Sequence, residues 1–294
     1  MQLGKKSKTT DIYEKVRGEM GPEAEEPTPL VTPQVSTPVP EKAPSARASL
    51  SDREPVHIRI AEAISATLTR EGALKLFEVK GDLKLRITDP SFTKLKLALL
   101  ANPTQGAQFR THPNVDKAAF TNSSTIQLKD ISKRFPSNSD IGVLRWRVAN
   151  SGSESADILP ITFNVWVNKG PDSTTVLVEY EFNGSDPLRD VVVTIPYGTT
   201  EPVVSSFDAS YEVSGDSFDW NIGSVDESNS SGSFEFESAG DSEENEFFPM
   251  NVRFSKVNPF VEVDVTDVSL LEMEGESTSF SKDVRSVTES YVIE

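Results

Sequence analysis

The run Leu83-Lys84-Leu85-Arg86-Ile87 alternates apolar and basic residues at every position. A period of two residues is typical of a β-strand that buries one face and exposes the other. Similar alternation recurs after residue 55, in runs bounded by Gly, Asn, Pro, Ser and Asp, which favour turns. Further strands are predicted over residues 56–60, 95–97, 143–148, 163–167, 176–182, 191–195, 218–222, 234–236, 250–254 and 260–265.

Helical periodicity is weak in the same part of the chain. No apolar period of 3.6 residues extends over more than about three turns after residue 60. About fifteen short strands at this spacing predict an all-β fold of antiparallel β-sandwich architecture. Because one core rarely holds so many strands, two β subdomains are expected.

The first 54 residues differ in composition from the rest. Seven prolines fall between Gly21 and Pro44, and no aromatic residue lies between Tyr13 and His57. Such a segment cannot bury enough apolar surface to offset its conformational entropy. Residues 1–54 are therefore expected to be a flexible, Pro-rich linker. A short helix is predicted over residues 10–20, either frayed or folding only on a partner.

Charge is distributed unevenly along the chain, whose formal net charge is −17. Residues 55–155 carry 15 basic and 9 acidic side chains, whereas residues 156–294 carry 6 basic and 28 acidic ones. The acidic total argues against nucleic acid as a partner, because that binding depends on Lys and Arg contacts with phosphates. The acidity either only keeps the β-rich part soluble or orients the protein on a partner.

Residues for catalysis or metal binding are scarce. The sequence has no cysteine and two histidines, His57 and His112, without GxSxG, GxGxxG, Walker, HxxxH or EF-hand spacing. A β-sandwich glycosidase would need two carboxylates in an aromatic-lined cleft, but the aromatic residues here alternate inward as core residues do. No catalytic residue, cofactor or metal is predicted. No run of 18 apolar residues predicts a membrane span.

The segment from Phe109 to Lys117 departs from the core pattern. It combines an aromatic ring, an imidazole, a proline and two basic residues, and Pro113 is incompatible with a central strand. The segment is either a binding loop that presents His112 and Asn114 or a structural turn in which Asn114 caps its own backbone.

Four stretches resemble the δ subunits of coatomer, the coat of COPI vesicles. They are residues 54–58 (EPVHI), 108–117 (QFRTHPNVDK), 135–147 (FPSNSDIGVLRWR) and 247–252 (FFPMNV). The resemblance covers essentially all of the chain, which corresponds to the C-terminal half of the δ subunits. It implies a μ-homology domain, the elongated all-β fold of clathrin-adaptor medium subunits, in which one β-sandwich subdomain is inserted into the other. On this basis residues 55–294 form the domain, with subdomain A over 55–156 and 247–294 and subdomain B over 157–246.

The same resemblance implies which ligands to expect. Clathrin-adaptor medium subunits bind tyrosine-based signals through a Phe and an Asp on the first strand and a Trp-Val-Arg element near the C-terminus. This chain has His57 and Arg59 on its first strand and Val263-Asp264-Val265-Thr266 near its end, so tyrosine-signal binding is not expected. The δ-coatomer resemblance implies instead the binding of tryptophan-based linear motifs of an endoplasmic-reticulum tether and of Arf GTPase-activating proteins.

A tryptophan side chain needs an apolar pocket with a polar rim, and an acidic motif would suit the basic strands of subdomain A. The candidate basic rim comprises Arg59, Lys84, Arg86, Lys94, Lys96, Arg110 and Lys117. The residues predicted to bind peptide are Arg59, Lys94, Lys96, Phe109, Arg110, His112, Pro113, Asn114 and Lys117.

The cellular role follows from the resemblance alone. It implies a non-enzymatic subunit of the COPI coat in Golgi-to-ER and intra-Golgi transport, cytoplasmic and peripheral on Golgi membranes and coated vesicles. Its partners would include the other coatomer subunits. The alternative is a purely structural arm that packs on coat subunits and membrane without a peptide pocket.

Overall fold

A computed structural model of the chain describes residues 53–152, 157–198, 201–273 and 275–294. The linker expected over residues 1–54 lies outside these ranges except for its last two residues. The helix expected over residues 10–20 lies outside them entirely. The described residues fold mainly as β-strands joined by short loops, so the expected all-β class is confirmed.

Sixteen strands are assigned within the described residues. They are β1 (Val56–Leu68), β2 (Leu74–Ile87), β3 (Leu95–Ala101), β4 (Gln108–Thr111), β5 (Thr125–Ile126), β6 (Ile141–Asn150), β7 (Ile161–Lys169), β8 (Ser173–Phe182), β9 (Leu188–Pro196), β10 (Val203–Val204), β11 (Tyr211–Ser214), β12 (Ser217–Val225), β13 (Ser231–Ala239), β14 (Met250–Lys256), β15 (Val263–Leu270) and β16 (Ser281–Ile293). The helical elements are α2 (Lys117–Ser123) and the 3-10 turns η2 (Pro90–Phe92), η3 (Thr104–Gly106), η5 (Glu227–Asn229) and η6 (Glu244–Phe247).

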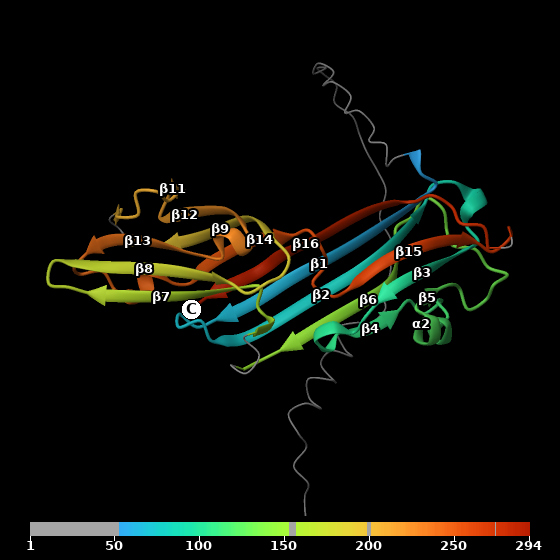
Figure 1. Ribbon diagram of the computed structural model, residues 1–294, viewed down its shortest axis with the longest axis horizontal. Coiled ribbons are helices and arrows are strands. Elements are labelled where there is room, and N and C mark those ends of the chain that lie inside the picture. The colour runs from blue at the N-terminus through green and yellow to red at the C-terminus, as the bar shows by residue number, and fades with distance from the viewer. Residues whose placement is uncertain (1–52, 153–156, 199–200, 274) are drawn as a thin grey trace, which may run out of the picture. The chain divides into compact units, whose positions relative to one another are not determined.

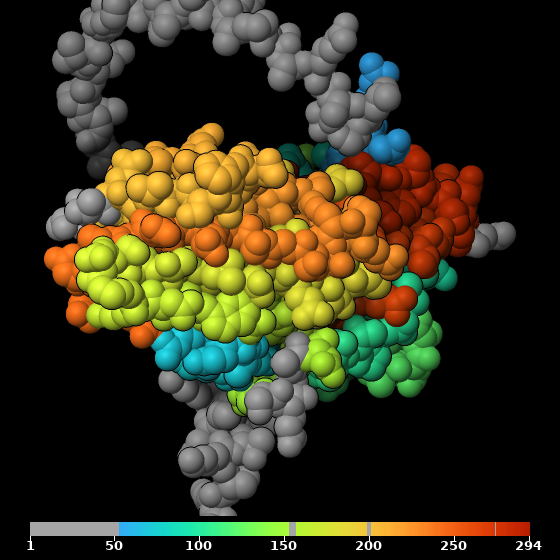
Figure 2. Space-filling view, turned by 60° about the vertical axis from the view of Figure 1, so that its left-hand side comes forward, coloured from blue at the N-terminus to red at the C-terminus, as the bar shows by residue number. Residues whose placement is uncertain are grey.

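Nine strands form one sheet in the order β11-β12-β9-β14-β16-β1-β2-β6-β4. Strand β1 is parallel to β16 on one side and antiparallel to β2 on the other. Figure 1 shows β16, β1, β2 and β6 running side by side. A four-stranded sheet, β10-β13-β8-β7, and a three-stranded sheet, β15-β3-β5, complete the fold. Segments β8 and β13 lie side by side on the surface seen in Figure 2.

The alternating side chains of the strands form the interior. Every second residue of β1 from Val56 to Leu68 is buried. In the four-stranded sheet, Tyr180 of β8 and Phe234 of β13 face Trp220 of β12, with ring centroids 5.9 and 5.3 Å from the indole. Aromatic residues therefore fill the space between the four-stranded sheet and the β12 end of the nine-stranded sheet.

A buried carboxylate connects several of these elements. Glu62 of β1 is 3% exposed. It accepts hydrogen bonds from Trp146 Nε1 of β6 at 2.8 Å and from Ser286 Oγ of β16 at 2.8 Å. The backbone N–H groups of Phe260 and Val261 donate to the same carboxylate. The charge is thus surrounded by donors, as a buried carboxylate requires.

The strand predicted over residues 260–265 is wrong at its start, because β15 begins at Val263. The backbone N–H groups of Phe260 and Val261 donate to Glu62, so they are not available to a strand ladder. From Val263 onward the segment pairs with β3.

The nine-stranded sheet contains strands from both expected subdomains. Residues 157–246 contain the whole four-stranded sheet and also β9, β11 and β12, which end the nine-stranded sheet. Strand β14, from the expected subdomain A, pairs with both β9 and β16. The nine-stranded sheet is therefore continuous across the expected boundary at residue 247, and the division into subdomains A and B stays a prediction.

Candidate functional site

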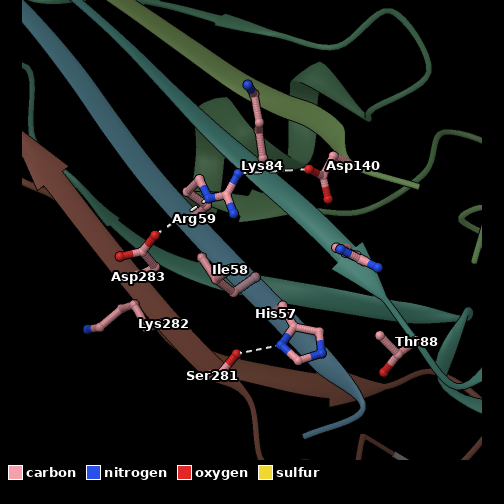
Figure 3. A pocket seen from close by; sticks show the side chains of 10 residues that line it. His57, Ile58, Arg59, Lys84, Thr88, Asp140, Ser281, Lys282 and Asp283 are labelled. Atoms are coloured by element: carbon pink, nitrogen blue, oxygen red, sulfur yellow. Dashed lines mark hydrogen bonds and ion pairs between the residues drawn. The ribbon is translucent and has the colours of Figure 1, made fainter. Parts of the chain in front are cut away.

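Two hollows contain residues that the sequence predicts to bind peptide. The first lies over β16, β1 and β2, has a volume of about 580 Å³, and is shown in Figure 3. We call it the basic hollow. It is lined by His57, Ile58, Arg59, Lys84, Arg86, Thr88, Asp140, Ser281, Lys282 and Asp283. Ile58 is its one apolar residue and is 2% exposed, so an apolar ligand would find little to contact.

Basic residues face each other across strands in the basic hollow. Arg59 of β1 lies opposite Lys84 of β2, and His57 lies opposite Arg86. The Arg59 guanidinium also reaches two carboxylates, with Nε 3.5 Å from Asp283 and Nη1 3.9 Å from Asp140. These pairs are exposed to solvent, where an ion pair contributes little to stability.

The second hollow, which we call the apolar hollow, has a volume of about 460 Å³. Its apolar lining consists of Val115, Leu128, Phe135, Pro136, Ile141 and Val143. Its polar lining consists of His112, Asn114, Lys129, Asp130, Lys133 and Arg134. Three of the polar residues are Lys or Arg and one is Asp, so the rim is predominantly basic.

Local hydrogen bonds shape the loop at the apolar hollow. His112 donates its backbone N–H to the carbonyl of Val143 on β6. The backbone N–H of Asn114 donates to His112 Nδ1 at 3.1 Å. One of the two alternatives for this loop is a structural turn in which Asn114 caps its own backbone. In the structure the His112 imidazole accepts the Asn114 N–H instead, and the side chains of His112 and Asn114 both line the apolar hollow.

Helix α2 follows the loop because Asp116 caps it. The Asp116 carboxylate accepts the backbone N–H groups of Ala118 at 2.9 Å and Ala119 at 3.2 Å. The hydrogen bond from Ala119 is the main cause that holds the pKa of Asp116 below its usual range. This cap fixes the direction of the chain after Val115, which is buried in the floor of the apolar hollow.

The nine residues predicted to bind peptide do not form one site. Arg59 lines the basic hollow, whereas His112 and Asn114 line the apolar hollow. Pro113 is exposed within the same loop, and Lys117 is exposed at the start of α2.

Like Pro113 and Lys117, the other four predicted residues lie outside both hollows. Phe109 is half-buried, with ring centroids 5.8 Å from Phe120 and 6.4 Å from Trp146. Arg110 is on β4, at the edge of the nine-stranded sheet. Lys96 is on β3. Lys94 Nζ lies 2.7 Å from Glu272, which also lies 3.6 Å from Arg134 on the rim of the apolar hollow.

Sequence reasoning missed most of the apolar hollow. Leu128, Lys129 and Lys133 carry no signal of their own in the sequence. Phe135, Ile141 and Val143 lie in the stretch 135–147 that carries the family resemblance, which is the only sequence signal that could have found them.

The described ranges show neither a metal cluster nor a membrane helix. They contain no group of three or more His, Asp or Glu side chains placed to hold a metal ion. No helix in these ranges is long and apolar enough to cross a membrane.

Known proteins match the chain in sequence and in structure. Residues 44–294 match the adaptor complexes medium subunit family. The probable coatomer subunit delta of Caenorhabditis elegans is 34% identical over 255 residues, which are 85% of this chain and 48% of that protein. The yeast delta-COP-I mu-homology domain matches with a TM-score of 0.71 and 26% identity, covering 82% of this chain and 98% of that domain.

A second structure of the yeast domain is complexed with a Dsl1 WxWxV peptide. It matches with a TM-score of 0.69 and 27% identity, again over 82% of this chain and 98% of that domain. The resemblance to coatomer δ subunits and the μ-homology fold that it implies are thereby confirmed. The chain spans about half the length of the curated relatives it matches.

Proposed function

The chain belongs to the adaptor complexes medium subunit family, and we propose that it binds tryptophan-based linear motifs in its apolar hollow. The observation that carries this proposal is a hollow of about 460 Å³ with an apolar floor and a predominantly basic rim. The similar yeast domain, which holds a WxWxV peptide, supports the class of ligand.

The chemistry of the apolar hollow suits an indole ring. Leu128, Pro136 and Ile141 offer accessible apolar surface above buried residues of the floor, and burial of an aromatic side chain supplies much of the affinity at such sites. The indole N–H needs an acceptor when it is buried, and the Asp130 carboxylate on the rim can provide one. Lys129, Lys133 and Arg134 would attract acidic residues that flank the motif.

The setting that we propose is the COPI coat. The chain would be a non-enzymatic part of a coatomer δ subunit, assembled with the other coatomer subunits and acting in Golgi-to-ER and intra-Golgi transport. It would be cytoplasmic and peripheral on Golgi membranes and coated vesicles. The motif-bearing partners would be an endoplasmic-reticulum tether and Arf GTPase-activating proteins. The coatomer δ relatives support this setting.

Calorimetric titration of an acidic peptide containing WxWxV into the full chain tests the proposal. We expect saturable binding that is lost when both tryptophans of the peptide are replaced by alanine. Leu128→Arg should abolish binding because it places a charge in the half-buried part of the floor. Leu76→Arg is the control, because it makes the same change at a 52% exposed leucine outside the hollow.

Two outcomes contradict the proposal. Absence of saturable binding by a chain with an intact circular dichroism spectrum would favour the structural arm without a peptide pocket. Unchanged binding by Leu128→Arg would place the peptide elsewhere on the protein.

A further inference from the structure

Basic side chains gather on the outward side of β1, β2, β6 and β4. These four strands are adjacent in the nine-stranded sheet (Figure 1). We call this surface the basic face. It consists of Arg59, Lys80, Lys84, Arg86, Arg110, Arg145 and Arg147. The basic hollow lies at one end of it.

Cations of the basic face lie directly opposite one another across strands. Arg59 faces Lys84 between β1 and β2, and Lys80 faces Arg147 between β2 and β6. Arg110 faces Arg145 between β4 and β6. Like charges directly opposite in a sheet destabilise it. These like-charge pairs do not themselves stabilise the sheet, so strand pairing does not explain why cations gather at these positions.

Carboxylates on the same strands are less exposed to solvent than the cations beside them. Glu78 is 17% exposed beneath Lys80 and Arg147, with Lys80 Nζ at 2.9 Å and Arg147 Nε at 2.5 Å. The Lys80 side chain is 60% exposed, so the charge presented to solvent at this point is positive. Asp82 is likewise less exposed than Lys84, which lies 3.3 Å from it.

Acidic residues neutralise only part of the basic face. Asp140 and Asp283 lie near Arg59 at the end of the basic hollow. Arg86, Arg110 and Arg145 form no ion pair among the residues that the structure describes. These three cations are spread over β2, β4 and β6, and Asp82 lies opposite Arg145 in the β2–β6 pair.

We propose that the basic face adsorbs to the surface of an anionic lipid bilayer. Four adjacent strands span roughly 15 Å at a spacing of about 4.8 Å, so the cations form a broad array and not a line. An extended peptide would reach only part of such an array, whereas a bilayer surface would contact all of it. Protein interfaces also need buried apolar or aromatic anchors. The basic face has almost none, since Leu76 is the exposed large apolar residue on these four strands.

At about 0.1 M salt the net charge of −17 opposes this contact only weakly. The Debye length is about 10 Å at 0.1 M salt, so acidic groups farther from the lipid are screened. Each Lys or Arg held near an anionic leaflet contributes favourably, and this attraction falls off within a Debye length. This inference rests on the proposed coat function for its membrane setting, but it involves a surface separate from the apolar hollow.

Vesicle co-sedimentation of the full chain tests the inference. At about 0.1 M salt we expect binding to vesicles of phosphatidylcholine and phosphatidylserine (about 3:1) and none to pure phosphatidylcholine. The variant Arg86→Gln/Arg110→Gln/Arg145→Gln should lower the partition coefficient at least about tenfold. Its matched control is Lys169→Gln/Arg189→Gln/Arg253→Gln, which removes the same charge from exposed positions outside the basic face and should retain binding.

Three results would overturn the inference: equal losses in the two triple variants, equal binding to neutral vesicles, or no binding to anionic vesicles by the unmodified chain. Binding to polyglutamate without binding to vesicles would assign the face to an acidic protein and would likewise overturn it. Leu128→Arg separates this test from the peptide proposal, because it should bind vesicles normally while losing the peptide.

Discussion

Removal of the Glu62 side chain should destabilise the fold. Its buried carboxylate accepts hydrogen bonds from Trp146, Ser286, Phe260 and Val261. Each buried donor left unsatisfied costs about 1–3 kcal/mol. Glu62→Ala should therefore lower the free energy of unfolding by about 3 kcal/mol or more, measured by urea titration.

Glu179→Ala is the control for this prediction. Glu179 is an acid at an exposed position of β8, where a substitution should change stability by less than about 0.5 kcal/mol. Equal stabilities of the two variants would show that the Glu62 network contributes little to folding.

Glu78 should make the stability of the protein depend on pH in the acid range. Burial raises its pKa, but hydrogen bonds from Lys80 and Arg147 outweigh burial, so the pKa lies below its ordinary value. A lowered folded-state pKa contributes stability above the unfolded-state pKa, and this contribution is lost as the pH falls through the folded-state pKa.

Glu78→Gln should accordingly be less stable than the unmodified chain near neutral pH, with the difference shrinking toward acid. Urea titrations at a series of pH values measure this trend. Arg147→Gln removes one of the two donors and should weaken the same dependence. A difference that stays constant from neutral to acid pH would contradict the assignment.

At the scale of elements, strand β2 depends on a glycine. Gly81 lies opposite Trp146 in the β2–β6 pair, and a Cβ at this position would overlap the indole ring. The ring cannot easily move because its N–H is bound to Glu62. Gly81→Ala should therefore cost about 1–3 kcal/mol, the usual penalty for overpacking.

Gly142→Ala provides a matched control on the neighbouring strand. The nearest atom to a Cβ at Gly142 is Arg145 Nε at 3.9 Å, an ordinary contact. Urea titration should show little change for this variant. If Gly81→Ala proves equally harmless, the indole ring must be freer to move than its hydrogen bond implies.

The elements that could be predicted from sequence are those that alternate strictly. The runs 83–87 and 176–182 are predictable as strands because every second side chain is apolar or aromatic and buried. Strand β16 was missed because its central positions are polar. Ser286, for example, is fully buried only because it donates to Glu62. Helix α2 was missed because seven residues are too few to show a helical period.

The candidate site was predictable only in part, for a related reason. The loop at His112 and Asn114 could be singled out by its local composition. Leu128 and Phe135 join the same hollow through contacts between segments that local sequence patterns do not encode. For instance, the N–H of Phe135 donates to the carbonyl of Thr93, over forty residues earlier.

At the scale of the whole molecule, the uneven distribution of charge along the chain corresponds to an uneven distribution of charged side chains over the folded sheets. Outward positions of β8 and β13 carry Glu179, Glu181, Glu235 and Glu237. The basic face belongs to the nine-stranded sheet, where β4 and β6 pair although 29 residues lie between them. These four acids and the basic face therefore lie on different sheets, and such a separation of charge can orient the molecule at a charged surface.

Sheet continuity should also make the described domain unfold as one cooperative unit. Strand β14 pairs with β9 on one side and β16 on the other. Strands β9, β12 and β11 of residues 157–246 therefore belong to the same hydrogen-bonded sheet as β1 and β2. Phe236→Ala in β13 should cost about 3–5 kcal/mol, because the ring is fully buried against Phe218 and Phe247.

Hydrogen exchange followed by mass spectrometry at increasing urea tests this cooperativity. In Phe236→Ala, the urea midpoints for peptides from β1 and β2 should fall as far as those from β8 and β13. Trp166→Ala, a change of a 44% exposed ring on β7 in the same four-stranded sheet, should shift both sets far less. Loss of protection in β8 and β13 alone would mean that residues 157–246 unfold independently, and that pairing through β14 is too weak to couple the two parts.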